Sequence, residues 1–215
     1  MAADIDPALV EAWLTARSIA RGLPLPVPDH GGWRVDTSSD KEIRRWVFPQ
    51  MADGLRELAD DIVEARYFLK LCGLAEQLIA AVPPRWKLQP AGYLMTATAS
   101  WCGPVASPEP YRLQVERQGV VTRVVATAAD GSIAASGNAA ETADAFVYDR
   151  IETDPAYRRR GLARCVMAAL AAEKKSRSTQ EILVATEEGQ KLYARLGWHV
   201  CSPYSTVTIP LQPVP

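Results

Sequence analysis

Histidine and cysteine are scarce in this sequence. Its 215 residues include two histidines, His30 and His199, and four cysteines that stand far apart with no Cys-x-x-Cys pair. A zinc site needs several closely spaced ligands of these types, and a hydrolase with a nucleophilic side chain usually needs a histidine base. We therefore expect neither a metal site nor a hydrolase triad. Cys165 and Cys201 are interpreted as buried free thiols.

Excess charge and long apolar runs are also missing. The chain has 24 Lys plus Arg against 25 Asp plus Glu, a formal net charge of -1, which gives no general attraction to nucleic acid or to anionic membranes. No apolar run reaches the ~18 residues of a membrane span. The first residues, MAADID, do not resemble a signal peptide. We expect a cytoplasmic monomer or homodimer with no nucleic-acid or membrane partner.

A linker divides the chain into two halves of similar size. Hydrophobic residues make up 48% of the sequence, which is enough for a sizeable core. The segment from Trp101 to Pro110 contains Gly103 and three prolines, a composition typical of linkers. We place a domain boundary there, which gives an N-terminal lobe of residues 1–105 and a C-terminal domain of residues 106–215.

In the N-terminal lobe, periodicity and capping signals predict both helices and strands. Asp6-Pro7 places a capping residue before a first-turn proline, and Ser39 followed by Glu42 fits a capping box. The expected helices cover about 7–21, 39–48, 53–61 and 74–82. The expected strands cover 33–37, 65–71, 86–88 and 93–98.

The C-terminal domain is expected to contain more strands. Asp130-Gly131 signals a hairpin, and Gly197 ends the last helix. The expected strands cover 111–117, 120–127, 132–135, 145–153, 181–186, 198–201 and 206–210, the expected helices cover 162–172 and 187–196, and a loop is expected at 137–143. This order predicts an α+β fold, a mixed α/β sandwich.

A short basic turn joins the strand at 145–153 to the helix at 162–172. It reads Arg-Arg-Arg-Gly-Leu-Ala from Arg158 to Ala163. The N-H groups of a first helical turn have no intrahelical acceptor, and together with the helix dipole they favour an anion. The turn is therefore either a phosphate site or a solvated basic helix start.

The turn resembles the acetyl-CoA pyrophosphate loop of the GCN5-related N-acetyltransferases, the GNAT superfamily. That loop reads Arg or Gln, two residues of any type, Gly, any residue, then Gly or Ala, and Arg158, Gly161 and Ala163 match it. Downstream, the stretch from Leu192 to Trp198 resembles the family's Leu-Tyr-x-x-x-Gly-aromatic ending. The resemblance covers residues 111–210, and it implies a GNAT fold in the C-terminal half with acetyl-CoA as cosubstrate.

The resemblance also implies roles for single residues. Tyr193 would be the general acid that protonates the departing thiolate, although a core tyrosine is the alternative interpretation. The residues expected to bind the cofactor are Ile151, Glu152 and Thr153 through backbone N-H groups, Arg158, Arg159, Arg160, Gly161, Leu162 and Ala163 in the turn, and Thr186, which stands where the family often has Asn.

The general base is less well defined by the sequence. Some relatives have an acidic residue nine positions before the loop, which corresponds to Asp149 here, with Glu152 as the second candidate. A salt bridge from Asp149 to a nearby arginine is the alternative. Strand alternation predicts that Val147, Asp149 and Ile151 share one face and that Glu152 lies on the other.

The sequence leaves open both the origin of the first half and the identity of the acceptor. The stretch around Trp86 and Tyr93 faintly repeats the one around Trp198 and Tyr204, so residues 33–98 are either a degenerate GNAT-like copy without the basic loop or a separate α/β lobe. This lobe is expected to build the acceptor side. The predicted activity is acetyl transfer to the amine of a small molecule. The alternatives are a protein lysine or N-terminal acetyltransferase and a non-catalytic acyl-CoA sensor or binding module.

Overall fold

The computed structural model describes residues 5–97 and 108–211. The helices are α1 (Pro7–Ala20), α2 (Asp53–Asp61), α3 (Ala75–Ala80), α4 (Leu162–Ala172) and α5 (Glu187–Arg195), with a 3-10 turn η1 (Pro155–Tyr157). The strands are β1 (Val27–Asp29), β2 (Gly32–Asp36), β3 (Arg44–Phe48), β4 (Tyr67–Cys72), β5 (Lys87–Leu88), β6 (Gly92–Ala97), β7 (Arg112–Gln118), β8 (Val121–Thr127), β9 (Ile133–Glu141), β10 (Ala145–Thr153), β11 (Gln180–Thr186) and β12 (Trp198–Thr208).

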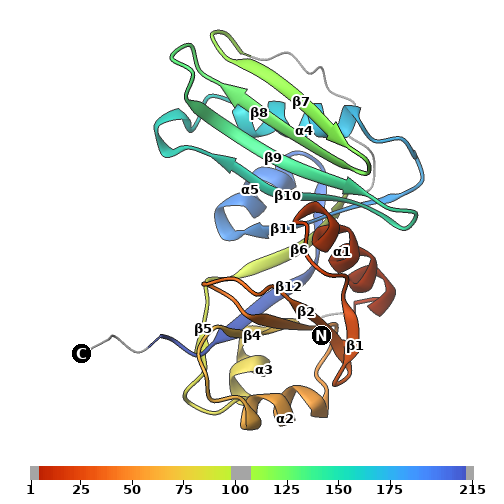
Figure 1. Ribbon diagram of the computed structural model, residues 1–215, viewed down its shortest axis with the longest axis vertical. Coiled ribbons are helices and arrows are strands. Elements are labelled where there is room, and N and C mark those ends of the chain that lie inside the picture. Colours follow the sequence, from red (N-terminus) through yellow and green to blue (C-terminus); the bar gives the residue numbers. More distant parts are fainter. Residues whose placement is uncertain (1–4, 98–107, 212–215) are drawn as a thin grey trace.

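The strands form one mixed sheet that runs through the whole molecule (Figure 1). Its order is β1-β2-β3-β4-β12-β6-β11-β10-β9-β8-β7, and β5 pairs with β12 beside this path. Most neighbours are antiparallel, but β3 with β4 and β10 with β11 are parallel. This confirms the predicted mixed α/β fold.

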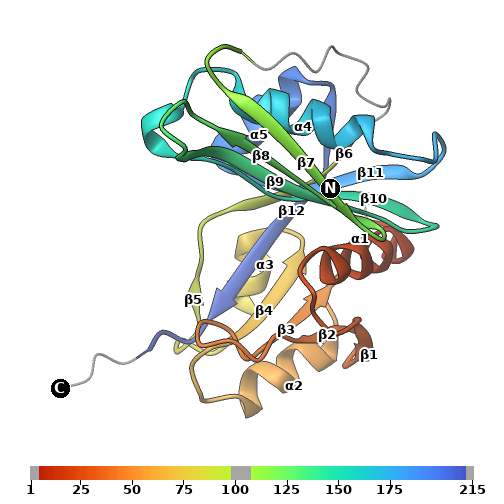
Figure 2. The same cartoon turned by 45° about the horizontal axis from the view of Figure 1, so that its top comes forward.

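Helix α1 covers one face of the sheet, whereas the other four helices pack on the opposite face. Its Trp13 and Leu14 lie in a core cluster with Val147 of β10 and Tyr204 of β12. The opposite face packs against α4 and α5 in the C-terminal half and against α2 and α3 in the N-terminal half. Figure 2 shows α1 beneath β9 and β10, with α4 above them. No helix in residues 5–97 and 108–211 is long and apolar enough to cross a membrane.

The two halves exchange strands at the centre of the sheet. Strand β6 from the first half pairs with β11, and β12 from the second half pairs with β4. The order β2-β3-α2-β4-α3 also matches β9-β10-α4-β11-α5, with an antiparallel pair followed by a parallel pair in each. Neither half therefore completes its sheet without the other. The predicted boundary at residue 105 lies outside the described residues.

Most predicted elements are confirmed within one or two residues. Helix α1 begins after Asp6, whose side chain caps Ala8 at 2.9 Å, as the Asp-Pro pair predicts. Strand β10 and helix α4 have the predicted bounds, and Gly197 follows α5 with a φ of 86°.

The predicted helix at 39–48 is wrong. The Glu42 N-H does donate to Ser39 Oγ at 3.1 Å, which is one half of the capping box. The two residues close a turn, and the chain then enters β3 beside β4. The aromatic and β-branched residues Trp46, Val47 and Phe48 are buried there on both faces of the sheet, and this tertiary pairing outweighs the local signal.

Two further predictions in the second half are corrected. The segment 137–143 is not a loop, because β9 continues to Glu141. Its small residues are typical of a loop, but in the structure Gly137 allows β9 to pack closely against Val166 and Leu170 of α4. The last two predicted strands are one strand, β12, which a register shift between Val200 and Ser202 bends without breaking.

Candidate active site

Strands β10 and β11 separate in the middle of the sheet. They pair in parallel only from Ala145 with Gln180 to Val147 with Ile182. Beyond this point β10 runs on to Thr153 and β11 to Thr186 without pairing to each other. The backbone of β10 that faces the gap is thus available to hydrogen-bond an extended ligand.

A β-bulge lies on β10 just beyond the point of separation. Asp149 pairs with Asn138 of β9, but Glu152 pairs with Ser136, so the register shifts by one residue in between. Arg150 takes a left-handed φ of 53° at this position. Bulges re-aim side chains and are frequent beside active sites.

The bulge overturns the predicted alternation of side chains. Ile151 packs in the cluster under α4, whereas Val147 packs under α1. Glu152 lines a hollow together with Asn138, whose register partner is Asp149. Glu152 and Asp149 therefore share the α1 face, because the extra residue inverts the order of the side chains.

The basic turn lies at the start of α4 with its backbone open to solvent. Arg159 and Gly161 both have left-handed φ angles, 65° and 78°. A Cβ on Gly161 would meet no atom within 4 Å, so its φ angle, rather than crowding, favours glycine. No side chain caps α4. The first-turn N-H groups and the exposed Arg158 and Arg159 form a site that suits a phosphate group.

Arg160 has a different role from its two neighbours. Its guanidinium donates to the hydroxyl of Tyr111 and lies over the ring of Tyr157, 5.5 Å from the centroid. It also donates to the Ala156 carbonyl at 3.3 Å. These contacts hold the turn against β7 and η1, so Arg160 shapes the loop.

Two threonines border the gap between β10 and β11. The Thr153 hydroxyl is buried and has no hydrogen-bond partner among the described residues. Since buried hydroxyls are normally paired, it is available to a ligand atom. Thr186 instead caps α5, because its hydroxyl accepts from the Gly189 N-H at 3.1 Å. That hydroxyl keeps its own proton to donate.

Tyr193 of α5 lies in the core on the α4 side of the gap. It is 7% exposed, and its ring packs 6.2 Å from that of Trp198. Burial raises its pKa to about 12. At neutral pH its hydroxyl is therefore a protonated phenol.

Asp149 is held by two arginines at the C-terminal end of α1. Arg21 donates from Nε at 2.7 Å and from Nη2 at 2.8 Å, while Arg17 Nε lies 3.4 Å away. Burial alone raises the pKa of Asp149, but the Arg21 hydrogen bonds and the arginine charges outweigh burial and lower it. The structure therefore has the predicted salt bridge. A carboxylate held in this way is a weak base.

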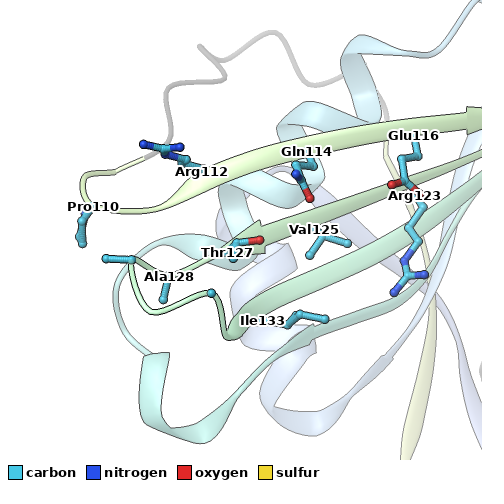
Figure 3. A pocket seen from close by; sticks show the side chains of 11 residues that line it. Pro110, Arg112, Gln114, Glu116, Arg123, Val125, Thr127, Ala128 and Ile133 are labelled. Atoms are coloured by element: carbon cyan, nitrogen blue, oxygen red, sulfur yellow. The ribbon is translucent and has the colours of Figure 1, made fainter.

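Two hollows lie on the α1 side of the sheet. The smaller one, about 280 Å³, is lined by Glu152, Arg150 and three polar residues of β8 and β9. The larger one, about 830 Å³, lies on the outer face of β7 to β9 and is lined by Arg112, Gln114 and Arg123 among others (Figure 3). The larger hollow contains none of the predicted site residues, so we assign the chemistry to the gap.

Sequence reasoning missed Arg17 and Arg21. Arg17 lies in the last turn of α1 and Arg21 is its C-cap residue, so the two are spaced i and i+4. Arg21 contacts a carboxylate 128 residues away, which no local pattern can reveal. The described residues contain no group of three or more His, Cys, Asp or Glu side chains that could hold a metal.

Residues 118–200 match the family model of the acetyltransferase (GNAT) domain. None of the curated proteins matches the sequence. Among solved structures, the chain is similar to a GCN5-related N-acetyltransferase from Kribbella flavida, with 15% identity, a TM-score of 0.65 and 98% coverage of both chains. It is also similar to a putative GNAT-family acetyltransferase from Novosphingobium aromaticivorans, with 19% identity, a TM-score of 0.56, and coverage of 95% of this chain and 97% of that chain. These structures share the fold along almost the whole chain.

Proposed function

The chain belongs to the GNAT superfamily through the acetyltransferase domain in its second half, and from this premise we propose that it transfers an acetyl group from acetyl-CoA to the amine of a small molecule. The observation that carries the proposal is the gap between β10 and β11, which begins beside the bulge and opens toward the basic turn. Acetyl-CoA supplies the acetyl group as an activated thioester.

The residues around the gap fit this donor. Arg158 and Arg159 would pair with the pyrophosphate together with the backbone of Gly161, Leu162 and Ala163. The backbone of β10 from Ile151 to Thr153 would hydrogen-bond the extended pantetheine arm. The orphaned Thr153 hydroxyl offers one further contact. The Thr186 hydroxyl would donate from the β11 side.

Direct transfer requires a proton for the departing thiolate and an amine that has lost its proton. Tyr193 keeps its phenolic proton at neutral pH and would donate it to the thiolate. Asp149 remains a predicted base, but its ion pairs weigh against that role. We assign the base to Glu152, which is exposed and lines the hollow on the α1 face.

We propose that the first half is a degenerate copy of the GNAT fold. It has lost the site for the acetyl donor and helps to form the binding site for the acceptor. Strands β3 and β4 stay paired from Arg44 with Tyr67 to Phe48 with Leu71, so no gap opens between them. The turn between β3 and α2 reads Pro-Gln-Met-Ala and has neither arginine nor glycine. A cytoplasmic location and a monomeric or homodimeric state stay predictions.

A screen of amines tests the proposed function. The purified chain is incubated with acetyl-CoA and a library of small amines, released thiol is measured, and products are identified by mass. We expect thiol release with a subset of amines and a mass increase of one acetyl group. Binding of acetyl-CoA without release for any small amine or lysine peptide would favour the sensor alternative. Release only with peptides would favour a protein acetyltransferase.

A further inference from the structure

Cationic side chains gather on the α1 face where the two halves meet. They are Arg17 and Arg21 at the end of α1, Arg45 of β3 and Lys70 of β4. The Lys70 ammonium lies 5.8 Å from the ring centroid of Tyr204 of β12. We call these five residues the interlobe cluster.

The cluster carries more positive than negative charge. Glu42 pairs with Arg45, and Asp149 pairs with Arg17 and Arg21. Three guanidinium groups thus face two carboxylates, before Lys70 is counted. Burial, followed by the charges of Arg45 and Arg21, lowers the pKa of Arg17 to about 9.

Two polar atoms of the cluster have no hydrogen-bond partner among the described residues. They are Nη1 of Arg45, a residue that is 4% exposed, and the hydroxyl of Tyr204, which is 7% exposed. Arg17 and Arg45 both interact electrostatically with Tyr204, so the two orphaned atoms belong to one electrostatic neighbourhood. Unpaired buried donors are rare because they lose their bonds to water, and here both are donors beside an excess of positive charge.

The cluster reaches the gap from the side opposite the basic turn. Asp149, which Arg17 and Arg21 bind, lies two residues beyond Val147, the last β10 residue that pairs with β11. Helix α1 lies on one face of the sheet and α4, which carries the basic turn, lies on the other (Figure 2). Arg17 and Arg21 are 16% and 18% exposed, so part of each side chain reaches solvent.

From this placement we propose that the interlobe cluster binds a carboxylate of the acceptor, which makes the substrate an amine that also carries a carboxylate, as an amino acid does. The Tyr204 hydroxyl and Nη1 of Arg45 would donate to the carboxylate, and Arg17 would add charge. The assignment of this carboxylate to the acceptor rests on the proposed function. Binding of an anion by the interlobe cluster can be tested independently of that function.

The Tyr204→Phe substitution is the most direct variant. It removes a hydroxyl that has no partner in residues 5–97 and 108–211, so the free protein should be as stable as the wild type or more stable. A hydroxyl kept for a ligand should nevertheless contribute to carboxylate binding. An unchanged melting temperature combined with weaker binding separates a ligand role from a structural one.

The first arm of the test measures anion binding by thermal melting. Wild-type protein is compared in sodium acetate and in sodium chloride of equal ionic strength. We expect acetate to raise the melting temperature, Tyr204→Phe to lose most of this rise, and Arg158→Gln in the basic turn to keep it. A rise that Tyr204→Phe leaves unchanged would overturn the proposal.

The second arm compares amino acids with their amides as acceptors at saturating acetyl-CoA. We expect thiol release at least ~10-fold faster with the acids, since a hydrogen bond to a charged group contributes about that factor. The preference should fall toward one in Tyr204→Phe. Equal rates with acids and amides would overturn the acceptor assignment and leave the proposed function intact. A Tyr204-dependent acetate effect without any thiol release would support the anion site and overturn the proposed function.

Discussion

Tyr193 is predicted to act through the proton that its buried phenol retains. Tyr193→Phe removes the proton and little volume, so thiol release should fall by about 10²-fold or more, while acetyl-CoA affinity should change by less than about threefold. Because its pKa is raised to about 12, the phenol stays protonated through pH 10, and wild-type turnover should show no loss from Tyr193 up to that pH. Steady-state rates and calorimetry check both expectations.

Tyr148 is the matched control for this variant. It is another buried tyrosine near the gap, but its hydroxyl donates to Glu181 at 3.0 Å. Tyr148→Phe should lower stability because it leaves part of a buried carboxylate unpaired. An equal loss of turnover in the two variants at matched stability would reject Tyr193 as the acid.

Lys70 is expected to make stability depend on pH. Burial, followed by the charge of Arg45, lowers its pKa from 10.5 to about 7. Between these values the unfolded chain binds a proton that the folded chain does not, so the free energy of unfolding rises with pH from about 7 to 10.5. Lys70→Met should be more stable than wild type at pH 7, and the difference should shrink as the pH approaches 10.

Chemical denaturation at several pH values checks this prediction, with Lys191→Met as control. Lys191 is 70% exposed and should leave the pH slope as in the wild type. A constant difference between Lys70→Met and wild type across pH 7 to 10 would contradict the prediction.

Single residues differ in how far the sequence could predict them. Tyr193 and the basic turn belong to short motifs whose order along the chain is itself the signal. The pairing of Asp149 with Arg21 and the gathering of Arg45 with Tyr204 depend on segments more than 100 residues apart. Such contacts depend on the tertiary pairing of strands from the two halves, so the local spacing of residues cannot predict them.

The bulge in β10 is coupled to the packing of α4 through Gly137 of β9. A Cβ on Gly137 would lie 2.4 Å from Cδ1 of Ile151 and 2.9 Å from Cγ1 of Val166. Gly137→Ala should therefore destabilise the protein by about 1–3 kcal/mol and weaken acetyl-CoA binding, because the bulge and the start of α4 both border the gap. Denaturant unfolding and calorimetry measure the two effects.

A second substitution tests whether the cause is this contact. Ile151→Val removes Cδ1, so the double variant should regain part of the stability that Gly137→Ala loses. Simple addition of the two losses would mean that the bulge and Gly137 are not coupled.

The elements that the sequence predicted poorly are those where tertiary contacts outweigh local signals. Ser39 and Glu42 do make a capping contact, yet β3 follows, because its side chains are buried between two layers. The alternation of β10 was predicted correctly up to Asp149 and wrongly beyond it, since a bulge adds one residue that no hydrophobic pattern marks.

The exchange of β6 and β12 predicts that the two halves fold as one unit. Without residues 1–105, β11 loses β6 and β12 loses β4, which exposes strand edges in the middle of the sheet. The fragment 106–215 alone should lack a cooperative unfolding transition, whereas the full chain should unfold in one step. Mixing the fragments 1–105 and 106–215 should restore acetyl-CoA binding.

Circular dichroism during thermal unfolding, followed by calorimetry of the mixed fragments, checks this. A fragment 106–215 that unfolds cooperatively and binds acetyl-CoA by itself would show that the second half is independent, and that the first half only adds to it.

The proposed function requires that acetyl-CoA binds in the gap between β10 and β11. The most direct measurement is calorimetric titration of acetyl-CoA into wild type, into Arg158→Gln/Arg159→Gln and into Arg177→Gln, an exposed arginine beyond the other end of α4. We predict one site per chain, a loss of affinity of ~10-fold or more in the double variant, since each arginine would donate charge-assisted hydrogen bonds, and wild-type affinity in Arg177→Gln. No binding to wild type, or equal binding to all three proteins, would contradict the account.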